Sequence, residues 1–440
     1  MRANIGSTAP RRNLLQTLNA LLDKILSTPS LYAVLCVIFL QPRIFLHRDE
    51  ELAAALNLPS FPFFRILLYG LLTLVFLCYA LRKTTGKTLK SNPALLCITG
   101  MFLYLAVITF VFDGASGYHI DWHCGFALMM LIDMGLQRER NSLVRGFTAA
   151  LEIWVYLNVL MILLFPESFA ASPTRKEWLI GNRVVYYRIV FPALAMALVR
   201  YHVLGKKMKW RTFLLIGACA FTVIIQRGGT AMISAALFVG LLIWCSRRAL
   251  PRYITPVTFI LVALLVFVGI HFFDVHKLFA EFITKGLGKT ITLSSRTLIW
   301  KKAMQIVFKN PITGIGYLPV AYKWEILGRK AASHTHNQLL ELMLHGGIIA
   351  VFLYLGAVFF SAKAALQHRR SPAVKTVAIL VCTFAFMGVV EIFHNDPIYY
   401  ALFVLLARAD CLAKDVKQLP RISIFTRIKR DIKKTKNRQK

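Results

Sequence analysis

Residues 253–274, with the sequence YITPVTFILVALLVFVGIHFFD, contain no Lys, Arg, Asp or Glu before Asp274. A helical run of about 20 apolar residues matches the hydrocarbon thickness of a bilayer. A helix that is apolar on all sides must be buried, either in the core of a large protein or in a membrane. This stretch therefore predicts a membrane-spanning helix.

Eleven other stretches have the same character. They cover residues 30–46, 62–82, 93–112, 119–136, 146–165, 184–202, 210–226, 229–246, 346–365, 374–391 and 397–413. The composition agrees, because 57% of the 440 residues are hydrophobic and only 17% are charged, whereas soluble domains are nearer half apolar and a quarter charged. We therefore expect an all-α, polytopic integral membrane protein of about 12 transmembrane helices with one long helical extracytoplasmic loop.

The chain is strongly basic, with 53 Lys and Arg against 20 Asp and Glu and a formal net charge of +33. Nucleic-acid-binding proteins carry such charge on a polar surface, but here the basic residues lie between long apolar runs, which excludes a nucleic-acid partner. Alternate connecting segments hold roughly two thirds of the basic residues, and this excess marks the cytoplasmic side. Both termini are therefore expected in the cytoplasm.

This topology divides the chain into five parts. They are a cytoplasmic N-terminal segment (1–29), transmembrane helices 1–9 (30–274), an extracytoplasmic catalytic loop (275–345), transmembrane helices 10–12 (346–413) and a cytoplasmic polybasic tail (414–440). We expect the tail to lie on anionic membrane lipids. The loop is the exception to short connections, and loops of that length are usually functional or contain their own structure.

Two helices are predicted in the long loop. The first follows Ser294-Ser295, presents Trp300, Met304 and Val307 on one stripe, and ends at Asn310-Pro311, because the residue before proline avoids the helical region. The second runs from about Asn337 to His345 and ends at a pair of glycines before the tenth span, as helices often do.

Metal binding is not predicted. The chain has eight cysteines but no C-x-x-C pair, and nearly all lie in or beside apolar runs, where they act as small hydrophobic side chains. His119 and His123, with Asp121 and Cys124 beside them, could bind a metal. Without a fuller motif, we interpret these four as interfacial polar residues. We expect neither a metal nor a cofactor.

Several arginines fall on the predicted outer side, where charged groups at membrane depth are costly and often functional. Arg227 lies between two spans joined by almost no loop, and Arg183, Arg188 and Arg296 lie on the same side. Arginine binds phosphate oxygens through paired hydrogen bonds and keeps its charge. Arg227 could simply cap a hairpin at the headgroup level, or these arginines could together bind a lipid-linked pyrophosphate.

His336 lies where a helix enters the membrane from the long loop. Its side chain could accept a proton from an acceptor hydroxyl near neutral pH, and Glu341, about one and a half turns further on, could orient it. His334, two residues before His336, does not share a helix face with it, which makes the pair a poor metal site.

Several motifs in this region together resemble the O-antigen ligase / O-antigen (polysaccharide) polymerase family of polytopic membrane glycosyltransferases. They are Ser295-Arg296-Thr297 with Trp300, the stretch from Asn310-Pro311 to Gly316, His334-Thr335-His336-Asn337 through Glu341, and Gly346-Gly347-Ile348-Ile349. Gln226-Arg227-Gly228-Gly229 is similar to a further family element, and residues 179–183 match more weakly. The resemblance covers roughly residues 220–365.

The resemblance implies a metal-independent, inverting glycosyltransferase in surface polysaccharide biosynthesis, whether of lipopolysaccharide, exopolysaccharide or capsule. Such enzymes transfer a glycan from undecaprenyl pyrophosphate to a sugar acceptor, either lipid A-core (ligases) or another lipid-linked repeat unit (polymerases). The reaction takes place on the outer face of the bacterial cytoplasmic (inner) membrane. These motifs do not separate ligases from polymerases.

The same resemblance implies roles for individual residues. His336 would be the base, with Asn337 and Glu341 positioning it. Arg227 and Arg296 would hold the pyrophosphate, with Arg183, Arg188 and His334 as further substrate-binding residues.

Two other classes remain open. One is a multi-span secondary transporter of a small anionic solute, although a loop that separates nine spans from three does not fit the two equal halves common in transporters. The other is a structural membrane protein, which would need no set of arginines and histidines beside the loop.

Overall fold

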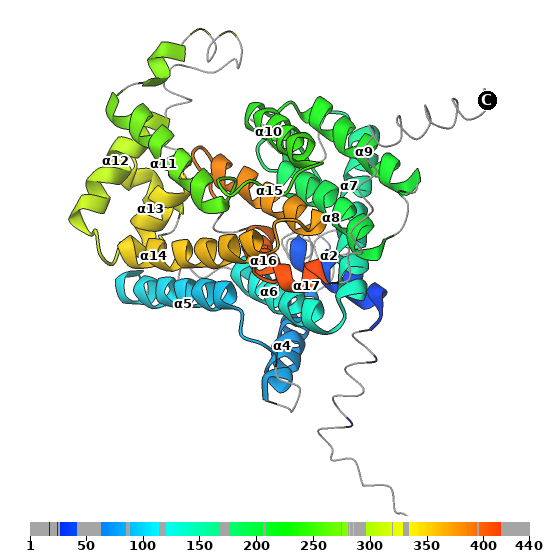
Figure 1. Ribbon diagram of the computed structural model, residues 1–440. Helices are drawn as coiled ribbons and strands as arrows, with labels where there is room; N and C mark the ends of the chain where they lie inside the picture. The colour runs from blue at the N-terminus through cyan, green and yellow to red at the C-terminus, as the bar shows by residue number, and fades with distance from the viewer. Residues whose placement is uncertain are drawn as a thin grey trace, which may run out of the picture.

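The computed structural model describes residues 27–41, 63–84, 89–113, 120–167, 176–205, 210–273, 275–279, 296–318, 320–328, 334–393 and 396–414, with a few isolated positions between them. These residues are helical almost throughout (Figure 1). The helices of the first half are α2 (Pro29–Leu40), α4 (Phe63–Thr84), α5 (Pro93–Asp113), α6 (Ile120–Arg138), α7 (Arg140–Leu164) and α8 (Tyr187–Leu204). Those of the second half are α9 (Trp210–Gln226), α10 (Gly229–Cys245), α11 (Pro256–Phe273), α12 (Arg296–Lys309), α13 (Val320–Ile326), α14 (Gln338–Gln367), α15 (Pro372–Met387), α16 (Pro397–Ala407) and α17 (Ala409–Ala413).

Each predicted span overlaps a helix of the described residues, and the last span covers both α16 and α17. Within the described residues, six helices are long and apolar enough to cross a membrane, namely α4, α5, α7, α8, α11 and α14. Five shorter ones, α2, α9, α10, α15 and α16, are apolar as well. The expected all-α, polytopic membrane fold is therefore confirmed. The second predicted loop helix and the tenth span together form α14, which starts at Gln338 and is broken at Gly347, within the glycine pair predicted to separate them.

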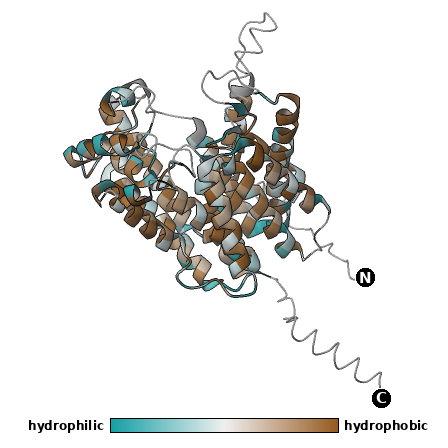
Figure 2. Cartoon of the chain, turned by 90° about the horizontal axis from the view of Figure 1, so that it is seen from above, coloured by the Kyte–Doolittle hydropathy of each residue, from teal (hydrophilic) through white to brown (hydrophobic). Residues whose placement is uncertain are grey.

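The outer faces of the bundle are apolar, and Figure 2 shows helices whose surface is largely hydrophobic. On α5, the side chains of Leu96, Leu103, Val107 and Phe110 are all at least 60% exposed. Their spacing places them on one helix face, while another face of α5 packs along α14. A continuous apolar stripe of this kind is expected where a helix contacts lipid.

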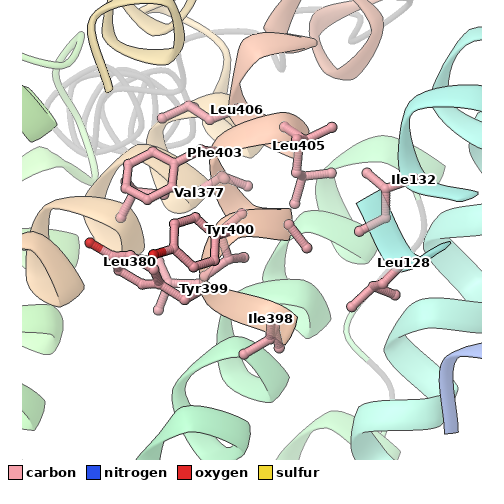
Figure 3. Packing of buried hydrophobic residues seen from close by; sticks show 14 of the residues in the cluster. Leu128, Ile132, Val377, Leu380, Ile398, Tyr399, Tyr400, Phe403, Leu405 and Leu406 are labelled. Carbon is pink, nitrogen blue, oxygen red and sulfur yellow. The ribbon is translucent and has the colours of Figure 1, made fainter. Parts of the chain in front are cut away.

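The interior is formed by long helices packed in pairs. α14 lies along α5, α2 along α7, and α8 between α7 and α15 (Figure 1). α16 lies at the centre, where Tyr399 and Phe403 lie on the side of Val377 of α15, and Leu128 of α6 lies on the opposite side (Figure 3). This central packing fixes α16, and the segment just before α16 contributes to the site described below.

Two buried carboxylates of the bundle are paired with arginines. The Asp133 carboxylate accepts a hydrogen bond of 2.6 Å from Nε of Arg408, and Glu152 accepts one of 2.6 Å from Nε of Arg211 and lies 3.7 Å from Arg200. An isolated buried charge would be strongly destabilising, whereas a hydrogen-bonded pair offsets much of that cost. These pairs join distant helices on the predicted cytoplasmic side.

The long loop contains α12, which ends at Lys309, just before Asn310-Pro311, as predicted. The predicted stripe is largely confirmed: Trp300 and Val307 are buried, and Met304 is partly buried against the same cluster, which also includes side chains of α11 and α14. Ser294 and Ser295, expected to precede the helix, lie outside the described residues.

Candidate functional site

The stretch 310–316 docks onto α14 where that helix breaks. The Ile315 amide donates a hydrogen bond of 3.0 Å to the carbonyl of Leu344. Gly347 has φ 58° and ψ −158°, a backbone conformation open almost exclusively to glycine, and a Cβ there would overlap the Ile312 carbonyl. Glycine is therefore required at this contact, which holds the first turns of α14 in place.

Residues 334–337, which we call the histidine segment, are tied down mainly through Thr335. Its carbonyl accepts a hydrogen bond of 2.8 Å from the indole of Trp300 on α12. Its amide donates to a carboxylate oxygen of Glu341 at 2.7 Å, and its hydroxyl donates to the carbonyl of Asn337 at 3.0 Å. The segment is thus fixed from α12 on one side and from α14 on the other.

Asn337 starts α14. Its side-chain oxygen accepts a hydrogen bond of 2.9 Å from the Leu340 amide, which is the usual N-cap interaction. Its side-chain nitrogen donates to the carbonyl of Val389 at 3.1 Å. Asn337 is therefore both a helix cap and a link to the segment 388–396 that precedes α16.

The two histidines contact each other directly. The His336 amide donates to Nδ1 of His334 at 3.3 Å, and the ring centroids are 4.0 Å apart. The pKa of His334 is lowered to about 4, first of all by burial; the Glu341 carboxylate opposes this shift, and nearby positive charges add to it. His334 is consequently neutral near pH 7, with Nδ1 free of a proton and able to accept.

His336 has a backbone φ of 56°. A residue other than glycine rarely occupies this left-handed region, and the strain is maintained only where the surroundings hold it. Here the surroundings are the bonds to Thr335 and the contact with His334. The imidazole of His336 is half-buried, so it remains accessible to a substrate.

Arg188 and Arg296 come from opposite parts of the chain and meet beside the histidine segment. Nη2 of Arg296 lies 3.1 Å from a carboxylate oxygen of Glu391. Arg188, at the start of α8, donates to the carbonyl of Ile392 at 2.8 Å, and its Nε lies 3.6 Å from the carboxylate of Asp396. Asn337 of the histidine segment bonds to Val389, two residues before Glu391, so both arginines and this segment are held by the same stretch before α16. The charges of both arginines also lower the pKa of His334.

Arg183 and Arg227 form a second group. Gly228, next to Arg227, lies so close to the backbone of Arg183 that a Cβ would overlap the Arg183 carbonyl. Both arginine side chains are exposed, and Arg227 has a left-handed φ of 43°. Arg183 follows the small hairpin of β1 (Glu177–Trp178) and β2 (Gly181–Asn182), and Arg188 is five residues further on. The short stretch 183–188 therefore connects the two arginine groups.

Lys323, on α13, is a functional candidate that the sequence did not reveal. Its Nζ lies 3.5 Å from a carboxylate oxygen of Glu341 and 4.1 Å from the ring centroid of Tyr317, and its side chain is 2% exposed. Burial lowers the pKa of Lys323, although the charge of Glu341 opposes the shift. The same carboxylate oxygen lies 3.7 Å from Nε2 of His345.

No pattern distinguishes Lys323 from the other basic residues of a strongly basic chain, so tertiary contact alone reveals it. Glu391 falls at the end of the predicted span 374–391 and is not singled out by the sequence. Asp396 belongs to a short polar stretch before Pro397, which the sequence indicates to be a simple, structural turn.

The predicted absence of a metal site stays a prediction. His119 and the side chain of Asp121 lie outside the described residues. Within the described part of the chain, no group of three or more His, Cys, Asp or Glu is placed to hold a metal ion. All eight cysteines are free, and seven of them are buried, in agreement with their reading as small hydrophobic side chains.

Comparison with known proteins agrees with this geometry. Residues 212–355, from α9 to the middle of α14, match the family model described as O-Antigen ligase. This stretch is similar to the O-antigen ligase family. The ligase-family region thus contains the docking glycines, the histidine segment, Arg227, Arg296 and Lys323. Arg183, Arg188, Glu391 and Asp396 lie outside it. Glu391 contacts the region through Arg296, and Arg183 contacts it at Gly228.

A curated relative is the exopolysaccharide production protein ExoQ of Rhizobium meliloti (strain 1021). It is 25% identical to this chain over 248 residues, which are 51% of this chain and 55% of ExoQ. The chain therefore matches about half the length of that relative.

Proposed function

We propose that this protein is an O-antigen ligase/polymerase-like glycosyltransferase of surface polysaccharide biosynthesis. It would transfer a glycan from undecaprenyl pyrophosphate to a sugar acceptor on the outer face of the bacterial cytoplasmic membrane. The single observation that carries the proposal is that Arg188, Arg296 and Asn337 of the histidine segment all bond to residues 389–392. The family match and the exopolysaccharide relative support it.

In the proposed reaction, His336 accepts the proton of an acceptor hydroxyl as that oxygen attacks the anomeric carbon of the donor sugar. The bond between this carbon and the pyrophosphate oxygen breaks, and undecaprenyl pyrophosphate leaves with the bonding electron pair. Attack from the face opposite the leaving group inverts the anomeric centre. The imidazolium then releases the proton to water.

Arginines are suited to the leaving group because their guanidinium groups stay charged and bind phosphate oxygens in pairs. Arg188 and Arg296, which lie near His334, would stabilise the charge that develops on the pyrophosphate. Arg183 and Arg227, whose side chains are exposed, would contact the rest of the pyrophosphate or guide its approach. No metal ion is required for this charge stabilisation.

Glu341 and Asn337 would keep the base in place. Glu341 binds the Thr335 amide, and Asn337 caps α14, so both act on the backbone that carries His336. His334 would act as a neutral acceptor for the His336 amide.

The decisive experiment is transfer by the purified protein with a lipid-linked glycan donor and a sugar acceptor. We expect His336→Ala and Arg296→Ala to lose transfer by about two or more orders of magnitude while their level in the membrane stays normal. His368→Ala, in the cap after α14 at its other end, is the matched control. Full transfer by His336→Ala would refute the assignment of the base.

The acceptor decides between ligase and polymerase. In a deletion strain, loss of a polymerase leaves single repeat units on the cell surface, whereas loss of a ligase leaves polymer on the polyprenyl carrier. Unchanged surface glycans together with altered uptake of a small anion would instead support the transporter.

A further inference from the structure

Segment 388–396, between α15 and α16, is described at residues 388–393 and 396, and these residues contact Arg188, Arg296 and the start of α14. The Gln338 amide, at the start of α14, donates to the Gly388 carbonyl at 2.8 Å, and the Phe393 amide donates to the Gln338 side chain at 2.7 Å. The same segment accepts hydrogen bonds from Asn337 and from Arg188. It therefore lies where α8, α12 and α14 meet, outside the region that matches the ligase family.

Two carboxylates of this segment face the two arginines assigned to the pyrophosphate. The Glu391 side chain is 5% exposed and pairs with Arg296, which is 17% exposed. The Asp396 side chain is 7% exposed and pairs with Arg188, which is 21% exposed. Asp396 also caps α16 by accepting from the Ile398 amide at 3.1 Å, so the position of Asp396 is fixed by the fold, and Glu391 is the better test.

A largely buried guanidinium without a counter-charge would be costly. The carboxylates provide that counter-charge when no anion occupies the site. A pyrophosphate that approaches Arg296 must then share or replace the bond to Glu391, and its negative charge is repelled by the carboxylate at the same time. Glu391 therefore weakens the binding of a pyrophosphate while it keeps Arg296 in position.

We propose that Glu391 is a positioning residue that acts through Arg296 as the counter-ion exchanged for the pyrophosphate. It holds the guanidinium at the site between turnovers and lowers the affinity for the pyrophosphate product, so that this product leaves after transfer. The inference rests on the proposed function, because it needs a lipid pyrophosphate as ligand.

The test measures binding of undecaprenyl pyrophosphate to the full-length protein in lipid nanodiscs, separately from transfer. Glu391→Gln keeps the shape of the side chain and removes its charge. We expect the dissociation constant to fall by about three- to tenfold, the range that one partly desolvated charge commonly controls. In the transfer assay the donor KM should fall by a similar factor, and kcat should fall as well if product release limits turnover.

A purely structural role predicts the reverse, since loss of an ion pair would loosen Arg296 and weaken binding. Glu391→Asp, which retains the charge, should bind like the unmodified protein. In the Arg296→Ala background, Glu391→Gln should change binding little, because the two residues act through one contact. Glu152→Gln is the matched control, because Glu152 is also a buried carboxylate and pairs with Arg200 near the other end of α8. This variant should leave the dissociation constant for undecaprenyl pyrophosphate unchanged.

The outcomes separate the two claims. If the unmodified protein neither binds undecaprenyl pyrophosphate nor transfers a glycan, the proposed function is wrong. If it does both, but Glu391→Gln binds equally or more weakly while remaining folded, only the role of Glu391 is refuted. Tighter binding by Glu391→Gln that persists in the Arg296→Ala background would also refute it, because the effect would not pass through Arg296.

Discussion

Acidification should destabilise the histidine segment through His334. Burial holds the pKa of this histidine at about 4 in the folded protein, against 6.5 for the ordinary side chain. Between these two values the unfolded chain binds the proton and the folded protein does not, so stability is retained above pH 6.5 and is lost as the pH falls through this range. Protonation also removes the Nδ1 acceptor that the His336 amide uses.

The magnitude follows from the shift. A difference of one pKa unit corresponds to about 1.4 kcal/mol, so the full effect of the His334 shift is about 3 kcal/mol. Most of it, about 2 kcal/mol, should be lost between pH 7 and about pH 4.5, since that interval covers most of the range between the two pKa values.

The assay is the free energy of unfolding in detergent micelles at about pH 7 and about pH 4.5, by denaturant titration. His334→Asn removes the titrating ring, and its side-chain oxygen can still accept from the His336 amide. This variant should lose about 2 kcal/mol less than the unmodified protein over the same interval. His368→Asn, after the far end of α14, should behave like the unmodified protein. Equal losses in His334→Asn and the unmodified protein would show that His334 is not buried in its neutral form.

Three further predictions concern packing and metals. Lys323→Met should lower the free energy of unfolding by about 3–5 kcal/mol, because the buried Glu341 carboxylate loses the positive charge of the lysine. Adding Glu341→Gln should restore part of this stability, and no restoration would show that the pair is not coupled. Gly347→Ala should lower the free energy of unfolding by at least about 1–3 kcal/mol, since it strains the backbone and overlaps the Ile312 carbonyl. The control, Gly70→Ala on an open helix surface, should be neutral or slightly stabilising. Equal thermal midpoints for the two variants would contradict the docking of residues 310–316 onto α14. Glycan transfer should persist in EDTA. Strong inhibition by EDTA, with activity restored by one added metal ion, would require a metal site.

Much of the candidate site could be selected from the sequence. The histidine segment, Arg296 and the glycine motifs are close together along the chain, and their order matches a known family pattern. Some of their contacts are local as well: Thr335 and Glu341 are joined across six residues. Short-range patterns of this kind can be recognised before the fold is known.

The partners of that site could not be selected in this way. Arg188 and Ile392 are 204 residues apart, and Arg296 and Glu391 are 95 residues apart. A carboxylate in a turn and a lysine in a basic chain have no distinctive pattern in one dimension. Only packing of α8, α12 and α14 against segment 388–396 shows which charges compensate one another.

The sequence by itself determined the membrane-embedded, all-α architecture, because the length and apolar character of a span are properties of one continuous stretch. The tertiary structure decided which arginines meet the histidines, why His336 adopts its left-handed backbone, and which carboxylates oppose the arginines. These features depend on distances between helices remote in sequence and on burial, which removes the water that would otherwise solvate each charge.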